Sequence, residues 1–210
     1  MRIGVIQAST RVEINELLFS TVQKVAGETH EVYNLGVFPS ELENYSYTEV
    51  AIMISLLIES GSLDFMVTGC SSGQGMMLAC NSLPGLKCGL VQTPQDAFLF
   101  GRINNGNVVS FPLGLNVRWS AELNLEYTLE KLFDGEFGVG YPKQDAGRKR
   151  QEASLLDELN RITKRSFKEI LPELPVELIQ KIWGRQFLHE FIQKHATNYE
   201  LIGLIEAIET

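Results

Sequence analysis

The feature that most constrains this chain is the segment 63–85, which reads LDFMVTGCSSGQGMMLACNSLPG. Its apolar start, residues 65–68, is typical of a buried parallel strand. Small residues follow at 69–75 and allow a tight turn whose backbone can approach a ligand closely. The sequence then predicts a helix over 76–81, ended by Pro84 and Gly85. A strand, a glycine turn and a helix N-terminus together favour an anion site, because free N–H groups and the positive end of the helix dipole meet there.

Cys70 lies at the mouth of this turn. A helix N-terminus lowers the pKa of a thiol and raises its reactivity, so Cys70 is a candidate nucleophile or base. The alternative is a small buried packing residue, which is what most free cysteines are. That alternative suits Cys80 and Cys88, which have apolar neighbours on a predicted helix and a predicted strand.

Three known phosphate-binding turns do not fit the spacing. A dinucleotide fingerprint requires a third glycine where Leu78 stands, and the Gly-Lys-Ser/Thr of a P-loop is absent. A cysteine phosphatase loop requires an arginine where this chain has Met76.

Composition narrows the class of protein. The chain has 210 residues, 44% of them hydrophobic, which fits one globular domain with an appendage. No apolar run reaches about 18 residues, so we expect no membrane partner. A strand that begins at Arg2 leaves no room for a signal peptide, and three cysteines without framework spacing indicate a reducing compartment. The net charge of −8 argues against nucleic-acid binding. We expect a cytoplasmic protein that acts on a small molecule.

Strands and helices alternate over the first two thirds of the chain. The predicted strands are 2–7, 31–34, 65–68, 87–91 and 107–111, and the helices between and after them are 13–26, 48–60, 76–81, 94–103 and 116–133. This alternation predicts an α/β fold with a doubly wound, Rossmann-like sheet of five parallel strands. Ligands of such sheets bind beyond the carboxyl ends of the strands, where the loops 9–11, 69–75 and 92–93 are expected.

The rest of the chain is predicted to be helical. After a glycine-rich loop over 135–147, helices are expected at 151–164, 166–171, 175–195 and 198–208. We divide the chain into a sheet domain, 1–147, and an all-helical C-terminal extension, 148–210. Apolar stripes on the extension must pack on the sheet domain or on a second subunit. The stripes comprise Leu155, Leu159 and Ile162, and Leu178, Ile182, Phe187 and Phe191.

The residues CSSGQG at 70–75 and ACNSLPG at 79–85 resemble the type B ribose-5-phosphate isomerase family, which includes the galactose-6-phosphate isomerase subunits. The family pattern is Cys-Gly-Thr-Gly-x-Gly followed by Ala-Ala-Asn-Lys-x-Pro-Gly. The likeness continues at 30–32, 94–99 and 104–108 and covers roughly residues 1–140. The resemblance implies aldose–ketose isomerisation of a phosphosugar through an enediolate, without a metal or other cofactor. It also implies a homodimer whose partner contributes to each site.

The resemblance implies site residues as well. Family members carry the base as the cysteine before the turn or as a glutamate after it; Met76 occupies the glutamate position, so the base is expected to be Cys70. Ser72 stands in place of the family's threonine as a hydroxyl donor, and N–H groups of the turn would stabilise the enediolate oxygen. The expected substrate-binding residues are Ser71, Gly73, Gln74, Gly75, Ser9, Tyr47 and Asn104.

Several family positions are changed in this chain. Ala8 and Ser9 replace an Asp-His pair, Ile103 replaces the histidine that assists ring opening, and Tyr141 and Asp145 lie at or near the positions of paired arginines. Candidates for phosphate binding are Arg11, Lys143, Arg148 and Arg150, each of which also fits an ordinary solvated surface charge.

Two other functions remain open. Loss of the histidine and arginines fits a non-catalytic sugar-phosphate sensor, whereas the retained Cys70 beside an intact Gly73-x-Gly75 favours an enzyme. A sugar-phosphate epimerase requires a base on each face of the substrate, and one base is visible. Because Ile103 cannot transfer protons, we expect a short or acyclic substrate such as a tetrose 4-phosphate, whose ring-closing hydroxyl is esterified.

Overall fold

The sheet has five parallel strands, as predicted. A computed structural model describes residues 1–115 and 120–209, without the side chains of the last two of these. The strands are β1 (Arg2–Val5), β2 (Glu31–Asn34), β3 (Phe65–Cys70), β4 (Cys88–Leu90) and β5 (Val108–Pro112). They lie in the order β2-β1-β3-β5-β4, and every adjacent pair is parallel. The central position of β3 confirms the buried strand that its apolar residues predict.

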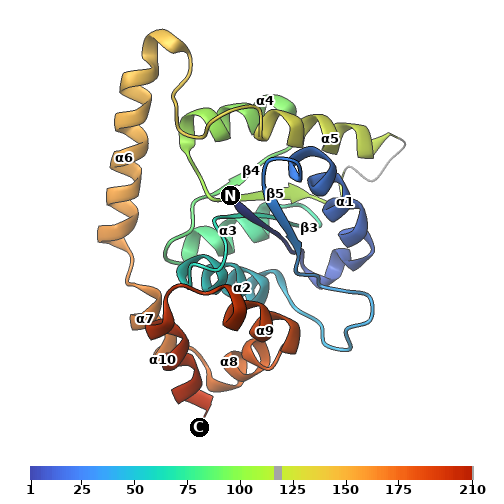
Figure 1. The fold of residues 1–210 in the computed structure, drawn as a ribbon, viewed down its shortest axis with the longest axis vertical. Coiled ribbons are helices and arrows are strands. Elements are labelled where there is room, and N and C mark those ends of the chain that lie inside the picture. The colour runs from blue at the N-terminus through green and yellow to red at the C-terminus, as the bar shows by residue number, and fades with distance from the viewer. Residues whose placement is uncertain (116–119, 210) are drawn as a thin grey trace.

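Helices cover both faces of the sheet (Figure 1). One face packs against α1 (Asn15–Ala26), α4 (Pro94–Leu99) and α5 (Ala121–Leu132), and the other against α2 (Tyr47–Glu59) and α3 (Gln74–Ser82). Alternate residues of β3 serve the two cores: Phe65 and Val67 face the first, and Met66 faces the second. The fold is therefore doubly wound and Rossmann-like.

Two predicted helices differ from the structure. The helix predicted over 94–103 ends as α4 at Leu99 and continues as a wider turn, η2 (Phe100–Asn104), which closes at Asn105 in the left-handed region. The single helix predicted over 175–195 is wrong: it is two helices, α8 (Val176–Trp183) and α9 (Gln186–His195). Gly184 ends α8, and Arg185 then takes an extended backbone while its side chain forms an ion pair with Glu41.

Smaller differences concern helix ends. A 3-10 turn, η1 (Ser9–Ile14), precedes α1, and the start of the helix predicted over 116–133 lies outside the described residues. Another short turn, η3 (Lys143–Asp145), leads into α6 (Ala146–Thr163). The division at residue 148 therefore falls in the first turn of α6, and the two-domain description stays a proposal.

The C-terminal helices pack on the sheet domain through α2. We call α7 (Phe167–Ile170), η4 (Leu171–Glu173), α8, α9 and α10 (Tyr199–Glu209) the C-terminal bundle. Phe167, Ile182 and Trp183 of the bundle are buried in one cluster with Met53 and Leu57 of α2. Helix α2 is thus buried between the sheet and the bundle, which explains why apolar residues occur all round it.

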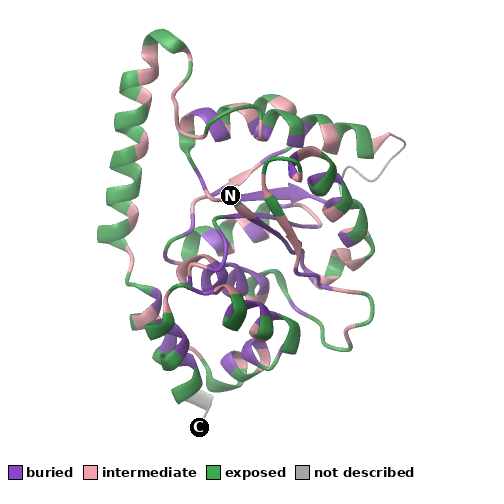
Figure 2. Cartoon of the chain, viewed as in Figure 1, coloured by how far each residue is buried: buried purple, intermediate pink, exposed green. Residues whose placement is uncertain are grey.

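Helix α6 is the exception among these helices. It runs along one side of the molecule (Figure 1), and none of its residues is buried, as Figure 2 shows. The exposed fractions of Leu155, Leu159 and Ile162 are 55%, 44% and 59%. The predicted apolar stripe of α6 therefore lacks a covering surface within the part of the chain that the structure describes. Within the same part, no helix combines the length and apolarity needed to cross a membrane.

Candidate active site

The glycine turn lies where the sheet reverses its winding. Helix α1 follows β1 on one face, and α3 follows β3 on the other, so the loops after these two neighbouring strands diverge. In open α/β sheets such a point forms the crevice in which ligands bind. Cys70 ends β3 and Ser9 begins the segment after β1, which places both at this crevice.

The backbone of the turn is fixed by the end of β5. Leu113 N donates to the carbonyl of Cys70 at 2.9 Å, and Gly114 N donates to that of Ser71 at 2.9 Å. The buried Ser110 hydroxyl donates to the carbonyl of Gly73 at 2.8 Å. Cys70 itself is only 7% exposed. The thiol is therefore held on a backbone that has little freedom to shift.

Gly73 is the N-cap residue of α3, and its backbone conformation requires a glycine. Its φ of 73° lies in the left-handed region, and a Cβ there would be 2.5 Å from the Leu90 side chain and 3.0 Å from the Phe111 backbone. No side chain caps α3, although the amide of Gln74 makes a 3.4 Å contact with the Ser72 hydroxyl. N–H groups of the first helical turn, such as that of Gly75, are left for an anionic ligand beside Cys70.

Arg11 is the predicted cation that the structure brings to the turn. Its Nε donates to the Ser71 hydroxyl at 3.1 Å, and its guanidinium lies so close to Gly114 that a Cβ there would be 2.7 Å from Nη2. Nη1 pairs with Glu13 at 3.0 Å, at a partly exposed position. Arg11 can therefore orient Ser71 and meet the acidic end of a substrate.

The other three candidate cations lie at or near the start of α6, and two of them have contacts there. Arg148 pairs with Glu152, and Arg150 donates to the carbonyl of Val139 at 3.0 Å. Lys143 belongs to η3, just before α6. Asn104 lines a separate cavity beyond the edge strand β4, together with residues of α6. Within a single chain, these three cations and Asn104 therefore do not lie around Cys70.

Ser9 and Tyr47 lie on the other side of the turn. The Ser9 hydroxyl accepts a hydrogen bond from Tyr45 N at 2.7 Å, and Ser9 N donates to the carbonyl of Tyr45 at 3.0 Å. The Tyr47 ring lies against Gly75, where a Cβ would be 3.3 Å from it, and the residue remains 44% exposed. Tyr47 is thus placed as a wall of the crevice, and Ser9 joins two loops.

The two remaining thiols occupy packing positions. Cys80 and Cys88 are buried, and Asn81 holds the Cys88 backbone by bonds of 2.8 and 2.9 Å. A hydrogen bond with Cys80 and burial raise the pKa of Cys88 well above its usual range, so Cys88 remains a neutral thiol. Among the residues that the structure describes, no group of three or more His, Cys, Asp or Glu side chains is arranged to hold a metal ion.

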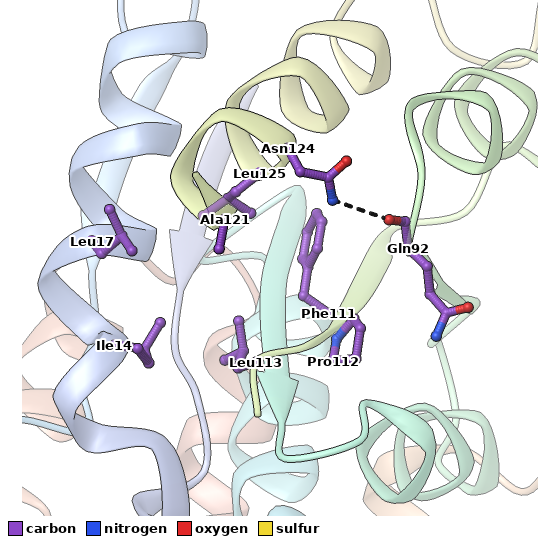
Figure 3. A pocket seen from close by; sticks show the side chains of 9 residues that line it. All are labelled: Ile14, Leu17, Gln92, Phe111, Pro112, Leu113, Ala121, Asn124 and Leu125. Carbon is purple, nitrogen blue, oxygen red and sulfur yellow. Dashed lines mark hydrogen bonds between the residues drawn. The ribbon is translucent and has the colours of Figure 1, made fainter. Parts of the chain in front are cut away.

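A second, apolar cavity opens at the end of β5, between α1 and α5 (Figure 3). Ile14, Leu17 and Leu125 line it, and Asn124 donates to the carbonyl of Gln92 at 3.3 Å on its rim. Leu113, whose amide fixes Cys70, also faces this cavity. It therefore adjoins the turn without including Cys70.

Sequence reasoning did not find the residues that support the turn. Gly114 and Ser110 act on it from β5 and the residues just beyond it, through a backbone amide and a buried hydroxyl, and Tyr45 acts on the neighbouring Ser9 through its backbone. The available signal was weak: Gly114 lies two residues after Pro112, just beyond a predicted strand, and the absence of a Cβ there leaves room for the Arg11 guanidinium.

Comparison with known proteins agrees with this geometry. Residues 3–136 match the model of a family described as Ribose/Galactose Isomerase. The chain belongs to this family. No curated protein matches it.

Two solved structures resemble the whole chain. One is a 4-deoxy-L-threo-5-hexosulose-uronate ketol-isomerase complexed with a tartrate, with 33% identity, a TM-score of 0.95, and 99% of each chain covered. Another is a ribose-5-phosphate isomerase from Vibrio parahaemolyticus, with 32% identity, a TM-score of 0.93, and 99% of each chain covered. A type B ribose 5-phosphate isomerase from Trypanosoma cruzi shares the fold, with 20% identity and a TM-score of 0.63; the match covers 77% of this chain and 99% of that one. The chain is therefore an isomerase.

The left-handed Gly73 provides a test of the turn. Gly73→Ala should lower the free energy of unfolding by about 1–3 kcal/mol, because it strains the backbone and crowds Leu90. It should also lower turnover, since the N–H groups of the turn would move. Thermal unfolding and steady-state kinetics measure the two effects.

Gly147→Ala is the matched control, because its Cβ would meet no atom within 4 Å and alanine favours a helix. If the two variants were equally stable and active, the turn would not depend on its glycine.

Proposed function

We propose that this chain interconverts an aldose and a ketose through an enediolate, with Cys70 as the proton-transfer base. The observation that carries the proposal is the position of Cys70, at the carboxyl end of a central strand and beside the uncapped N-terminus of α3. Membership of a sugar isomerase family makes this reaction the natural use of such a thiol.

The chemistry follows from the geometry of the turn. The Cys70 thiolate takes the proton from C2 of an open-chain aldose, and the C1 carbonyl becomes the enediolate oxygen. N–H groups of the α3 N-terminus stabilise that negative oxygen. The thiol then returns the proton to C1, and the C2 hydroxyl loses its proton as the ketone forms. In this proposal the Ser72 hydroxyl passes the proton between the two oxygens.

The substrate is proposed to be an open-chain sugar with a terminal acid group. An enediolate forms only from the open chain, and the hydrocarbon side chain of Ile103 cannot assist ring opening. Arg11 supplies a cation beside the turn for a carboxylate or a phosphate. A 4-deoxy-5-hexosulose uronate, the substrate named for one similar enzyme, has no hydroxyl on C4 or C5 to close a ring onto C1. A tetrose 4-phosphate is acyclic for the reason given above.

We propose that the active form is a homodimer. The apolar stripe of α6 is exposed, while Asn104 and the cations at the start of α6 lie away from Cys70 within one chain. A second copy that covers α6 would bury the stripe and would bring these residues toward its partner's turn. The second copy would then cover the open side of the crevice beside Cys70.

Cys70→Ala should reduce kcat by at least about 100-fold, as expected for loss of a general base, while substrate affinity stays nearly unchanged. Steady-state kinetics and ligand titration measure these quantities. Cys80→Ala and Cys88→Ala are the controls, and they should lower stability with little effect on kcat because both thiols are packing residues. A Cys70→Ala enzyme with near-native turnover would refute the assignment of the base.

Substrate choice is tested by comparing kcat/KM for three compounds: a 4-deoxy-5-hexosulose uronate, erythrose 4-phosphate and ribose 5-phosphate. The two acyclic acids should be better substrates, because each already presents the open chain. Tartrate should compete with them, as a small acyclic acid. A higher kcat/KM for ribose 5-phosphate would show that another group opens the ring.

The dimer is tested by Leu159→Glu on α6, which places a charge in the proposed interface. Sedimentation velocity should show weaker dimerisation, with the dimer Kd raised at least about tenfold, equal to about 1.4 kcal/mol. Leu42→Glu is the control, since Leu42 is 99% exposed and lies away from α6. Identical sedimentation of wild type and both variants would contradict an α6 interface.

A further inference from the structure

The segment that carries Tyr45 and leads to Tyr47 has little internal structure. It comprises residues 36–46, between β2 and α2, and we call it the β2–α2 segment. We propose that Lys181 and Arg185 of the C-terminal bundle are positioning residues that hold this segment against the glycine turn. They would thereby set the position of Tyr47 in the substrate site. This inference rests on the proposed function and adds a determinant of specificity to it.

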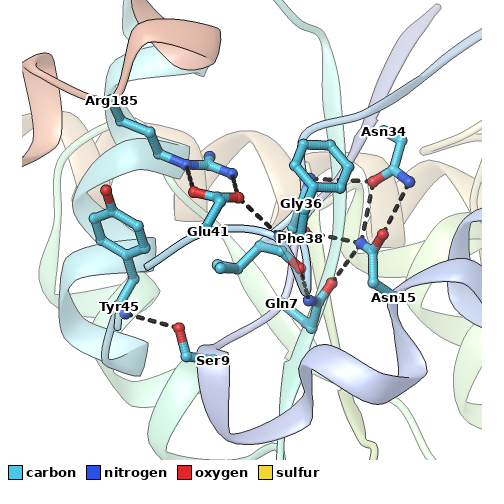
Figure 4. Close-up of polar contacts among 10 residues, drawn as sticks. Gln7, Ser9, Asn15, Asn34, Gly36, Phe38, Glu41, Tyr45 and Arg185 are labelled. Atoms are coloured by element: carbon cyan, nitrogen blue, oxygen red, sulfur yellow. Dashed lines mark hydrogen bonds and ion pairs between the residues drawn. The ribbon is translucent and has the colours of Figure 1, made fainter. Parts of the chain in front are cut away.

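Arg185 holds the middle of the segment by a two-pronged ion pair. Nε donates to one carboxylate oxygen of Glu41 at 2.7 Å, and Nη2 donates to the other at 2.6 Å, as Figure 4 shows. The Arg185 side chain is 3% exposed, and Glu41 also accepts from Phe38 N at 2.7 Å. A buried, bidentate pair of this kind fixes both direction and distance.

Lys181 holds the end of the segment. Its ammonium donates to the carbonyl of Asn44 at 2.8 Å and to Glu49 at 2.6 Å. Although partial burial works in the opposite direction, hydrogen bonds from Lys181 and Ser46 hold the pKa of Glu49 below its usual value. Glu49 therefore stays charged and continues to cap α2, whose first residue is Tyr47.

Both cations also lie over the ring of Tyr45, at 5.1 Å for Lys181 and 5.5 Å for Arg185. The backbone of Tyr45 makes the two hydrogen bonds with Ser9, and Tyr47 packs on Gly75 two residues later. Contacts therefore run without interruption from the bundle to the catalytic turn.

The start of the segment also has polar anchors outside the bundle, in addition to the packing of Phe38 on Phe187 of α9. Gln7 donates to the carbonyl of Val37 at 2.9 Å, and Asn15 donates to Gln7 at 2.8 Å and to the carbonyl of Gly36 at 3.0 Å (Figure 4). Loss of the Lys181 and Arg185 contacts would therefore free the portion from Glu41 to Tyr47, while the hydrogen bonds at Gly36 and Val37 stay in place. A buried ion pair contributes little net stability relative to apolar packing, so positioning is the better account of Arg185.

The test is a double-mutant cycle between Lys181→Met and Tyr47→Ala, with KM and kcat measured for the acyclic acids. Lys181→Met should raise KM about fivefold and change kcat less than about twofold, because it shifts a binding wall and leaves Cys70 in place. In the Tyr47→Ala background it should have no further effect on KM. Equal effects in the two backgrounds would overturn the proposal.

Lys168→Met is the matched control, since it removes the ion pair with Glu200 in the same bundle, away from the segment. It should leave KM unchanged. Arg185→Lys tests the bidentate ion pair with Glu41. Lysine keeps the charge but cannot form both hydrogen bonds to the carboxylate, so KM should rise as it does for Lys181→Met.

Hydrogen exchange gives a readout that needs no substrate. The amides of Phe38 and Tyr45 should exchange faster in Lys181→Met and Arg185→Lys than in wild type, and at the wild-type rate in Lys168→Met. Unchanged exchange in all three variants would overturn the proposal. Absence of turnover by wild type on every acyclic acid would instead refute the proposed function, and exchange alone would then decide the role of the bundle.

Discussion

The arrangement of the site depends on three hydrogen bonds that fix the glycine turn to the end of β5. Two are backbone bonds, to the carbonyls of Cys70 and Ser71, and one comes from the buried Ser110 hydroxyl. They form only if β5 lies beside β3, since both backbone donors come from residues just beyond β5. The sheet order therefore places the thiol, and the left-handed Gly73 then directs the chain into α3. The N-terminus of α3 meets Cys70 because both are held by the same strand end.

Helix α2 transmits order between the two halves of the molecule. It packs on the sheet through residues such as Met53, and the bundle packs on it through Trp183. Helix α2, buried between the sheet and the bundle, gives the bundle a fixed base, so polar side chains on α8 and at the start of α9 can hold distant backbone at defined positions. The ion pairs of Lys181 and Arg185 are useful for that reason. On a mobile helix the same charges would contribute little.

Local patterns were sufficient to predict the sheet, because apolar strands and amphipathic helices alternate and the glycine turn follows a strand. They placed Cys70, Ser72 and Gly73 on one turn, and Arg11 among the candidate cations. They could not predict that Arg185, at the break between α8 and α9, pairs with Glu41, because this partner is 144 residues away. For the same reason they missed Gly114 and Tyr45, which act through backbone atoms. Lys143 and Arg148 were grouped with Arg11 by charge alone, which carries no information about position.

The site thus has two parts with different physical bases. The turn that carries Cys70 is held by main-chain bonds, which are insensitive to which side chains surround it. The side chains that we propose contact the substrate, such as Arg11 and Tyr47, lie on other segments and are held by separate interactions. Changes such as Ile103 in η2 can therefore alter which substrates bind without moving the thiol. We propose that this separation lets the proton-transfer apparatus stay fixed while the walls around it change, so that related chains can take different sugars.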